Sequence, residues 1–471
     1  MIYFNVTTSM RWRGAPVGIV RTEIEFAKRI LENAKNVKLL NYASGSFSIV
    51  EANDYLRQLD NNRYNNERTC IGETTSTSPL NFCNYSKRQA LKLLANSIYC
   101  LSPRFARRTE EKLMIWARKI VLSYLEKGRY KIKKNKIDFS LALAPAPASV
   151  RFDIENLHQE DVFISMGLDW DSGIAEKLFQ IKKKGAKIVS VCYDTIACDY
   201  PQFVANASYP KIIKEYFFDI LESAEKVGCI SKCSQADFLR FAENTGSRLP
   251  ETFVFPLGSD IDSVKFKISE EEISESIRKL GDKKYILYVS TIERRKNHQV
   301  LYQAYRRLGE QNKLSDMPIL VFVGMTGWGV NDLLNDIRLD PVVKEKIILT
   351  GRVNESELAF LYRNCRYTVF PSLYEGYALG IVESLAFGKM VLASRKGAIP
   401  EVGNDYLMYI DDALSVNEWA EALLRLETDT KLVEEKEKKI RDSFRPITWD
   451  DSYRDFINKI DDVIGMTSNQ K

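Results

Sequence analysis

The sequence predicts an α/β protein of two doubly wound domains, and three observations lead to this expectation. Its 471 residues exceed the size of a single typical hydrophobic core, so two domains of about 200 residues are the natural division. Short apolar runs suited to buried strands alternate with segments of helical periodicity, which is the pattern of parallel sheets covered by helices. The composition, 45% hydrophobic and 28% charged, is that of a soluble globular protein.

The sequence shows no targeting or membrane-spanning segment. Its beginning, MIYFNVTTSMRWRGAPVG, lacks the basic flank and continuous apolar core of a signal peptide, and no apolar run is long enough to cross a bilayer. We therefore expect the protein to stay in the cytoplasm. The eight cysteines form no C-x-x-C pair and there are only two histidines, which favours buried reduced thiols over a zinc site.

The first domain is predicted to cover residues 1–258. Residues 1–6 form an apolar run suited to a first parallel strand, and residues 19–31 have the apolar spacing of a helix. The loop between them contains Gly14 and Gly18, and a turn is one interpretation of these glycines.

Further along this domain, the run GAKIVSVCYD indicates another strand. Asp194 stands at its carboxyl end, where α/β sheets place ligand-binding groups. The later run VGCISKCSQADFLRF indicates a strand and a helix whose N-cap is Ser231 or Ser234.

A strongly basic segment interrupts the first domain at about residues 86–136. It holds fifteen Lys and Arg against three Glu, so it carries +12 and the rest of the chain −7, for a net charge of +5. Apolar positions between the charges favour helices, which predicts a helical insertion. Its basic face either binds anionic lipid head groups or is simply solvated, and both interpretations stay open. Nucleic acid is not expected as a partner, because no recognition module is present.

The second domain is predicted to cover residues 259–445, and a terminal helix over residues 446–471 is expected to cross back to the first domain. The strand-like runs YILYVS, PILVFVG and KIILTG alternate with helical segments, as in a doubly wound domain. Trp449 is expected to anchor the terminal helix, and Gly258 lies near the crossing between the domains.

The most informative stretch is residues 371–388, PSLYEGYALGIVESLAFG. The preceding RYTVF, residues 366–370, predicts a buried strand. From about Leu379 the spacing becomes helical, and Gly388 stands where a C-terminal cap belongs. A helix that begins after such a loop offers free N–H groups and a positive dipole end, so we expect it to bind an anion such as a nucleotide diphosphate.

Two carboxylates belong to this stretch. Glu375 lies in the loop and Glu383 one turn inside the helix, so both are expected to face one crevice at different depths. Carboxylates would repel a bare phosphate, but they are strong hydrogen-bond acceptors for the diols of a sugar and a ribose. The pattern therefore predicts a ligand that carries hydroxyl groups as well as a diphosphate.

A cationic loop, STIERRKN, follows the strand-like run YILYVS. Arg295 and Lys296 can neutralise a departing diphosphate without a metal, by stabilising the charge that grows in the transition state. Two D-x-D tripeptides, Asp169–Asp171 and Asp260–Asp262, are of a type that binds divalent metals. Neither belongs to an early nucleotide-binding unit, so no metal site is expected.

The setting PSxYEGxxLxxxExLAxGK, with E-x7-E inside it, resembles the donor-site signature of family 4 retaining glycosyltransferases, which have the GT-B fold. The resemblance covers nearly the whole chain and is most specific over residues 285–403. It implies two Rossmann-like domains facing a central cleft, in which Glu375 contacts the donor sugar and Glu383 holds the ribose. The neighbouring loop residues are implied to bind the donor as well: Gly376, Tyr377, Ala378 and Leu379.

The resemblance also assigns groups around the reacting centre. Lys296, helped by Arg295, is implied to hold the leaving diphosphate, and Asp194 to shape the reacting centre. Many members carry a further Arg where this chain has Ser290, which makes Arg294 the candidate substitute.

Other positions match the family's pattern less completely. Arg21 fits the G-I-x-R pattern of one subgroup, whereas Tyr193 and Ala197 stand where relatives often have His and Pro. Glycines of the first loop are implied to reach the donor phosphates, and residues at later strand ends to hold the base through backbone contacts: Gly14, Gly18, Gly324, Arg352 and Val353.

The predicted function is the retaining transfer of a hexose from a nucleoside diphosphate sugar to a hydroxyl group, without a cofactor. The details GLDW, T-I-E-x-R-K-N and VG-x-x-GW resemble bacterial mannosyl- and rhamnosyl-type transferases of surface polysaccharide, including O-antigen. The resemblance implies GDP-mannose as donor, a lipid-linked saccharide as acceptor, and work at the inner face of the plasma membrane. Two alternatives stay open: a nucleotide-sugar epimerase of similar fold, and a non-catalytic membrane-associated scaffold.

Overall fold

The computed structural model describes residues 1–12, 18–69, 150–259 and 269–465, which belong to one compact unit. It contains an N-terminal and a C-terminal sheet. Gly14, Asp260–Asp262 and the predicted basic insertion lie outside the described residues. Among the residues that are described, none of the helices combines the length and hydrophobicity that crossing a membrane requires.

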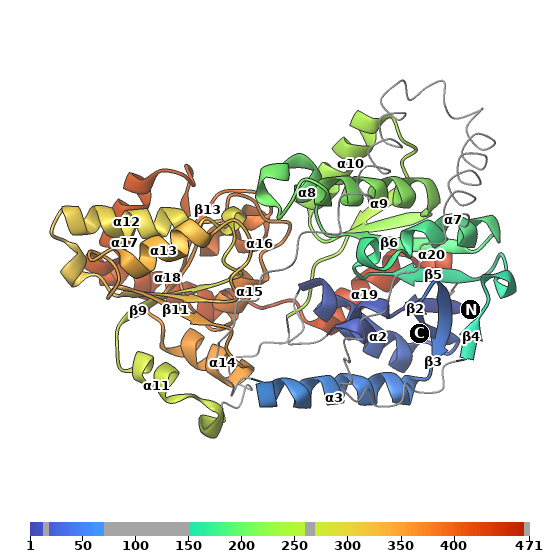
Figure 1. Ribbon diagram of the computed structural model, residues 1–471, viewed down its shortest axis with the longest axis horizontal. Coiled ribbons are helices and arrows are strands. Elements are labelled where there is room, and N and C mark those ends of the chain that lie inside the picture. The colour runs from blue at the N-terminus through green and yellow to red at the C-terminus, as the bar shows by residue number, and fades with distance from the viewer. Residues whose placement is uncertain (13–17, 70–149, 260–268, 466–471) are drawn as a thin grey trace, which may run out of the picture. The chain divides into compact units, whose positions relative to one another are not determined.

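The N-terminal sheet has eight strands in the order β4-β3-β2-β1-β5-β6-β7-β8 (Figure 1). The strands are β1 Ile2–Asn5, β2 Val37–Ala43, β3 Ser46–Val50, β4 Val150–Phe152, β5 Val162–Ser165, β6 Lys187–Cys192, β7 Lys226–Cys229 and β8 Glu251–Val254. All neighbours from β2 to β8 are parallel. The direction of strand addition reverses between β1 and β5, and such a switch point is where open α/β sheets bind ligands.

Helices cover both faces of this sheet, which confirms the doubly wound prediction. They are α1 Thr7–Arg11, α2 Gly18–Asn33, α3 Ala52–Thr69, α6 Asp169–Ser172, α7 Ala175–Lys183, α8 Ile196–Asp199, α9 Tyr209–Ser223 and α10 Lys232–Thr245. One core holds Leu178 of α7 and Phe217 of α9, and a second core holds Phe26 of α2. Ser231 caps α10 by accepting from the Ser234 N–H, so the N-cap is the first of the two serines that the sequence allowed.

One edge of the sheet departs from the parallel pattern, because β3 pairs antiparallel with both β2 and β4. Ser44 and Gly45 connect β2 to β3 with φ angles of 52° and 85°. Two consecutive positive φ angles belong to the two-residue turn that matches the twist of a hairpin. This hairpin was not predicted, although Ser-Gly between the apolar runs VKLLNY and FSIV indicates it.

The C-terminal sheet is wholly parallel, with six strands in the order β11-β10-β9-β12-β13-β14. The strands are β9 Tyr285–Val289, β10 Ile319–Val323, β11 Ile347–Gly351, β12 Thr368–Phe370, β13 Val391–Ser394 and β14 Met408–Ile410. The helices are α11 Glu275–Gly281, α12 His298–Glu310, α13 Asn331–Leu339, α14 Glu355–Asn364, α15 Leu379–Ala386, α16 Ile399–Gly403, α17 Val416–Thr428 and α18 Thr430–Ser443. Here the switch point lies between β9 and β12.

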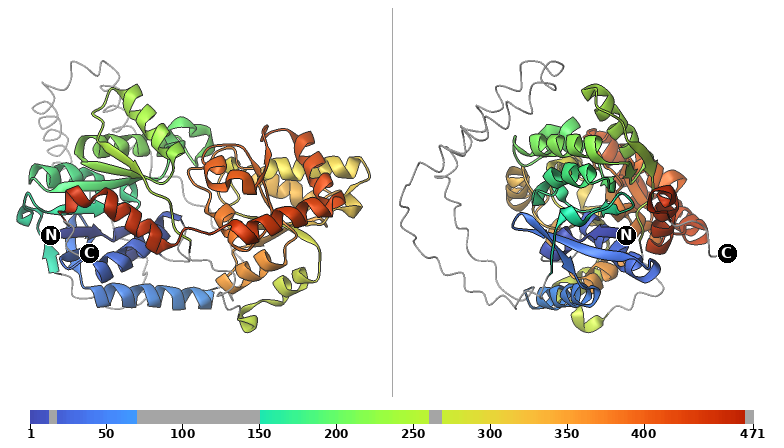
Figure 2. Two further views of the ribbon diagram at one scale, coloured as in Figure 1. Left: turned by 180° about the vertical axis from the view of Figure 1, so that it is seen from behind. Right: turned by 90° about the vertical axis from the view of Figure 1, so that its right-hand side faces the viewer.

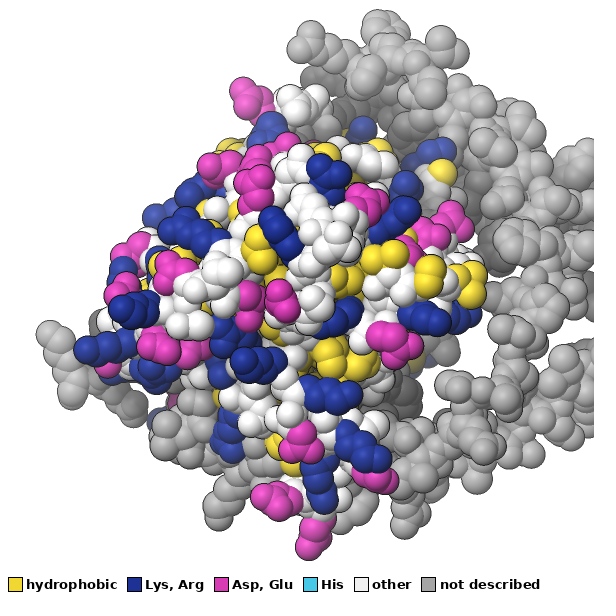
Figure 3. All heavy atoms as spheres, turned by 90° about the vertical axis from the view of Figure 1, so that its left-hand side faces the viewer, with side chains coloured by type: hydrophobic (Ala, Val, Ile, Leu, Met, Phe, Trp, Pro, Cys, Tyr) yellow, Lys and Arg dark blue, Asp and Glu magenta, His cyan; other side chains and the backbone are white. Residues whose placement is uncertain are grey.

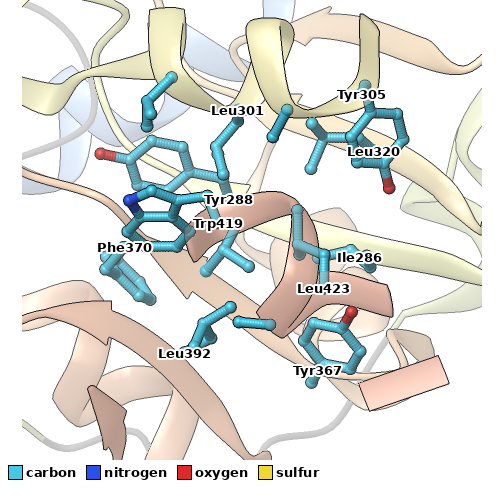
Figure 4. Close-up of a cluster of buried hydrophobic side chains, with 14 of the residues drawn as sticks. Ile286, Tyr288, Leu301, Tyr305, Leu320, Tyr367, Phe370, Leu392, Trp419 and Leu423 are labelled. Atoms are coloured by element: carbon cyan, nitrogen blue, oxygen red, sulfur yellow. The ribbon is translucent and has the colours of Figure 1, made fainter. Parts of the chain in front are cut away.

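The hydrophobic core of this half explains why the sequences of its strands are continuous apolar runs (Figure 4). Ile286, Leu320 and Leu392 project from three strands toward Leu301 of α12 and Trp419 of α17, and all five side chains are fully buried. A parallel strand is buried on both faces, so its sequence does not alternate.

Helix α15 has the bounds that its spacing predicted, and Gly388 follows it with φ 68°. The helical spacing predicts an inward face of Leu379, Val382, Leu385 and Ala386. Val382 and Leu385 are buried, but Leu379 and Ala386 are only half-buried, and Ile381, which the spacing left out, is fully buried.

Two terminal helices, α19 Trp449–Lys459 and α20 Asp461–Ile464, follow α18 (Figure 2). Trp449 is 2% exposed and its ring lies 6.4 Å from Phe26 of α2, so α19 contributes to the N-terminal core. A Cβ on Gly258 would lie 2.5 Å from the Trp449 Cα, so only glycine allows this approach. On the face shown in Figure 3, basic and acidic side chains intermingle.

Candidate active site

The candidate site is formed where two loops leave neighbouring strands of the C-terminal sheet. One loop follows β9 and ends in a 3₁₀ turn, Arg294–Lys296; the other follows β12 and contains Glu375. The Leu373 N–H donates to the Arg295 carbonyl at 2.8 Å, which joins the two loops directly. The site therefore lies at the switch point of this sheet.

Glu375 is held between two cations. Its Oε1 accepts from Lys296 Nζ at 2.6 Å and its Oε2 from Arg295 Nη1 at 2.7 Å. The carboxylate is buried, and burial alone would raise its pKa; Arg295 and Lys296 outweigh this and lower the pKa to about 2. Glu375 is therefore ionised at neutral pH.

Arg295 is fixed by three groups. Besides Glu375, its Nη1 donates to the Tyr374 carbonyl and its Nη2 to Glu293, each at 2.8 Å. These contacts use three of its five N–H donors, and the bond to Glu375 uses one of three on Lys296. Within the described residues the remaining donors have no hydrogen-bond partner, so they are available to an anion such as a diphosphate.

Two residues that were not among the predicted site residues shape these loops. Asn297 has a left-handed backbone, φ 56°, and donates through Nδ2 to the carbonyls of Pro371 and Ala413 at 3.1 and 2.8 Å. Tyr288, buried in β9, donates to the Lys296 carbonyl at 2.8 Å. The Asn in RRKN was a usable signal, because Asn tolerates this backbone better than most residues.

Gly397 is a further residue that shapes the site and that the sequence motifs did not indicate. A Cβ there would lie 2.4 Å from the Glu375 carbonyl oxygen and 2.7 Å from its nitrogen, and φ is 57°. The neighbouring Ala398 N–H donates to the same carbonyl at 2.9 Å. Glycine is therefore required where the chain after β13 passes behind Glu375.

The loop after Glu375 contacts residues of the N-terminal half. Gly376 accepts from Ser231 Oγ at 2.8 Å, and a Cβ on Gly376 would meet the Tyr193 carbonyl at 2.7 Å and Asp194 Cβ at 3.0 Å. The Tyr377 hydroxyl donates to the Leu257 carbonyl at 3.0 Å.

Two further residues of the predicted donor-binding loop complete its path into α15. Ala378 has a φ of 81°, a strained backbone for a residue with a Cβ, and Leu379 begins the helix directly after it.

Asp194 stands beyond the carboxyl end of β6, as predicted. Its Oδ1 accepts from the Ile196 N–H at 3.0 Å. Burial raises its pKa, while Arg295 opposes this shift and Glu375 adds to it. A Cβ on Gly376, the residue after Glu375, would lie 3.0 Å from Asp194 Cβ, so Asp194 lies beside the charged cluster.

Glu383 lies on the second turn of α15 and has partners of its own. It accepts from the Tyr362 hydroxyl at 3.0 Å, and Arg21 Nη1 of α2 lies 3.6 Å from its other oxygen. Burial raises its pKa and Arg21 opposes that shift. Gly18 begins α2 with φ 28°, three residues before Arg21.

The residues assigned to the nucleotide base lie at neighbouring strand ends. Gly324 follows β10, and its Cβ would lie 2.0 Å from the Ser290 carbonyl, so the loops after β9 and β10 touch. Arg352 and Val353 follow β11; Arg352 is exposed and contacts the Met325 sulfur.

Asp169, the first residue of a D-x-D tripeptide, has a structural role. It is 1% exposed and accepts from Ser165 Oγ at 2.6 Å and Asn5 Nδ2 at 3.1 Å. These bonds link the ends of β1 and β5.

The comparisons with known proteins agree with this geometry. Residues 269–443 match the family model described as "Glycosyl transferases group 1". O-antigen chain mannosyltransferase B of Escherichia coli is 28% identical over 227 residues, 46% of this chain and 58% of that protein. The MMP alpha-(1->4)-mannosyltransferase of Mycolicibacterium hassiacum is 26% identical over 56% of this chain and 59% of its own length. The chain thus matches less than two thirds of either relative.

Solved structures resemble the whole chain at low identity. HepE of Anabaena, in complex with UDP and glucose, superposes with a TM-score of 0.58 at 16% identity and 98% coverage of both chains. Sucrose-phosphate synthase of Thermosynechococcus elongatus gives 0.55 at 14% identity and 99% coverage of both. We conclude that residues 269–443 resemble the group 1 glycosyltransferases and that the chain has the GT-B fold.

Proposed function

We propose that the protein is a family 4-like retaining glycosyltransferase that moves a hexose from a nucleoside diphosphate sugar to a lipid-linked glycan without a metal. The main support for this proposal is the cluster of Glu375, Arg295 and Lys296 at the switch point of the C-terminal sheet, with Asp194 beside it. This cluster combines a fixed acceptor for sugar hydroxyls with unused cationic donors.

In this proposal the cations bind the group that leaves. The bond between C1 of the hexose and the diphosphate oxygen breaks, and its electron pair departs with the diphosphate. Arg295 and Lys296 donate to that growing charge, and they are already oriented by their bonds to Glu375. The acceptor oxygen then bonds to C1 on the same face, and its proton passes to the oxygen of the departing diphosphate.

The carboxylates bind the hydroxyl groups of the donor, whereas the cations bind its diphosphate. Glu375 accepts hydrogen bonds from hydroxyls of the hexose, and Glu383 accepts from the ribose diol. Asp194 borders the reacting carbon. The residues that follow them are proposed to bind the donor through their backbone: Gly376, Tyr377, Ala378, Leu379, Gly324, Arg352, Val353 and the first-loop glycines Gly14 and Gly18.

We propose GDP-mannose as donor and O-antigen or a related surface polysaccharide as the product. The support is that the Escherichia coli relative is named an O-antigen chain mannosyltransferase and the Mycolicibacterium relative is also named a mannosyltransferase. A lipid-linked acceptor would place the reaction at the cytoplasmic membrane surface, where the basic segment at about residues 86–136 would meet anionic lipid.

The first test is thermal stabilisation by GDP, UDP, dTDP and their common sugar conjugates, in EDTA. Ligand at about 100 times its dissociation constant should add roughly 2.7 kcal/mol to the free energy of unfolding. A shift with GDP and GDP-mannose alone supports the proposed donor, and a shift with another nucleotide replaces it. No shift with any nucleotide overturns the transferase proposal.

A second test separates the alternatives. Incubation with the stabilising donor alone should leave its sugar unchanged, whereas an epimerase would convert it. A scaffold would bind anionic vesicles and show no nucleotide-dependent shift at all.

A further inference from the structure

A buried carboxylic acid, Glu23 of α2, lies under the N-terminal side of the candidate site and has no role in the proposed reaction. Its side chain is fully buried, and its Oε1 accepts from the Ser9 N–H and the Ser9 hydroxyl, both at 2.6 Å. Ser9 belongs to α1, so this carboxyl group joins α1 to α2.

The other oxygen of Glu23 faces a third segment. A Cβ on Gly167, in the loop after β5, would lie 2.2 Å from Glu23 Oε2 and equally close to Thr8 Oγ1. The loop therefore packs directly against the Glu23 carboxyl group. Leu168 of the same loop donates its N–H to Thr8 Oγ1 at 2.7 Å. Oε2 itself has no hydrogen-bond partner within the described residues.

The surroundings of Glu23 disfavour a negative charge. In the part of the chain that the structure describes, no Lys, Arg or His forms an ion pair with Glu23. Its ionisable electrostatic neighbours are Asp169, Tyr55 and Tyr193. Burial raises the pKa of Glu23 to about 8, with a further contribution from Asp169. The acid is therefore largely protonated at neutral pH, because its pKa lies above 7.

Two connections lead from this joint to the candidate site. Arg21, two residues before Glu23 on α2, faces Glu383 at 3.6 Å. The Tyr193 hydroxyl donates to the Met166 carbonyl at 2.6 Å, so the loop that packs on Glu23 also holds the residue before Asp194.

We propose that Glu23 is a positioning residue: as an uncharged acid it locks α1, α2 and the loop after β5 into one unit, which sets Arg21 against Glu383 and Tyr193 beneath Asp194. Ionisation of Glu23 would place a buried charge against the Gly167 backbone and loosen this unit. The effect on substrate rests on the proposed function, whereas the lock itself does not.

The test compares Glu23→Gln with the wild-type chain by denaturant unfolding between pH 5 and pH 9. Gln keeps the oxygen that accepts from Ser9 and turns an N–H₂ toward Thr8, so it imitates the protonated acid. A carboxyl group whose folded-state pKa is raised loses stability as pH rises from its ordinary value of 4.5 through about 8. The unfolding equilibrium constant of the wild type should therefore rise relative to that of Glu23→Gln by roughly several hundredfold across this range.

Glu25→Gln is the matched control on the same helix. Glu25 pairs with Lys28 and Arg29, which lower its pKa against the effect of burial. The wild type should therefore have a higher free energy of unfolding than Glu25→Gln, and this difference should persist at high pH. A wild-type chain whose stability relative to Glu23→Gln is independent of pH overturns the lock. So does a Glu23→Gln chain that is less stable than the wild type at pH 9.

A second readout tests positioning. The affinity for the stabilising nucleotide, measured at pH 7 and pH 9, should fall at pH 9 more in the wild type than in Glu23→Gln. If the stability difference appears and the affinity difference does not, the lock stands and its link to Arg21 is overturned. If no nucleotide binds at any pH, the transferase proposal fails. The pH dependence of unfolding of the wild type and of Glu23→Gln still tests the lock in that case.

Discussion

Lys296 Nζ and Glu375 Oε1 lie 2.6 Å apart, although 79 residues separate them in the chain. The contact exists because β9 and β12 are neighbours at the switch point of the C-terminal sheet, so the loops that follow them meet at one edge. Arg295 and Lys296 thus keep Glu375 ionised, and Glu375 in turn opposes the effect of burial, which lowers the pKa of Lys296.

Removing the carboxylate should destabilise the fold as well as abolish transfer. Glu375→Ala leaves Arg295 and Lys296, both less than one fifth exposed, without their shared partner. We expect the free energy of unfolding to fall by about 3–5 kcal/mol, the usual cost of an unpaired buried charge, measured by urea denaturation. Glu243→Ala is the control, because Glu243 is exposed on α10 and should change stability by about 0.5 kcal/mol at most.

The same carboxylate predicts a pH dependence. Its pKa of about 2 lies below its ordinary value of 4.5, so ionised Glu375 stabilises the fold at neutral pH and this contribution is lost as pH falls from about 4.5 toward 2. The difference in unfolding free energy between the wild type and Glu375→Gln should therefore shrink between pH 5 and pH 3. A difference that stays constant over that range would contradict the lowered pKa.

Many members of the family carry an Arg at the position of Ser290, and Arg294 is expected to bind the diphosphate in its place. Its stem packs over Gly329, and within the described residues its guanidinium makes no hydrogen bond or ion pair. Arg294→Ala should weaken nucleotide diphosphate binding about tenfold, or about 1.4 kcal/mol, and leave the melting temperature unchanged. Calorimetric titration measures this.

A rescue variant makes that prediction specific. Arg294→Ala combined with Ser290→Arg should recover most of the lost affinity, because the cation returns at the strand end. Arg338→Ala, at an exposed position of α13, is the control for a general loss of positive charge. Equal weakening by Arg294→Ala and Arg338→Ala would show that Arg294 makes no direct contact.

Gly397 and Gly246 test the close approach behind Glu375. Both have positive φ, 57° and 61°, but a Cβ on Gly397 would meet the Glu375 backbone at 2.4 Å, whereas none of the described atoms lies within 4 Å of a Cβ on Gly246. Gly246→Ala should therefore cost only the backbone strain, about 1 kcal/mol. Gly397→Ala should cost more and reduce nucleotide binding, and similar unfolding free energies for the two variants would refute the steric requirement.

The basic segment is expected to bind anionic membranes. Replacing Lys131, Lys133, Lys134 and Lys136 by Ser should lower co-sedimentation with phosphatidylglycerol vesicles at least tenfold, since each cation contributes about 1 kcal/mol at such a surface. Raising the salt concentration should have the same effect. The matched control replaces four exposed lysines of the C-terminal half by Ser: Lys283, Lys313, Lys344 and Lys431. If both variants bind vesicles equally, the segment is only a solvated charged surface.

The sequence by itself determined the elements of the site. The run RYTVF, the following loop and the helix from Leu379 to its cap at Gly388 are local patterns, and the structure contains all three. Such patterns are readable because burial on both faces of a parallel strand and on one face of a helix leaves a regular apolar spacing.

The tertiary structure decided which side chains meet. Glu375 pairs with Arg295 and Lys296, whereas Glu383 faces Tyr362 and Arg21, and the spacing of the two acids along the chain predicted neither set of partners. The requirement for glycine at position 397 likewise depends on a backbone more than twenty residues away in the chain. Strand order and burial set these contacts and the pKa values that follow from them, and neither is encoded in local spacing, because both depend on segments that only the folded sheet makes neighbours.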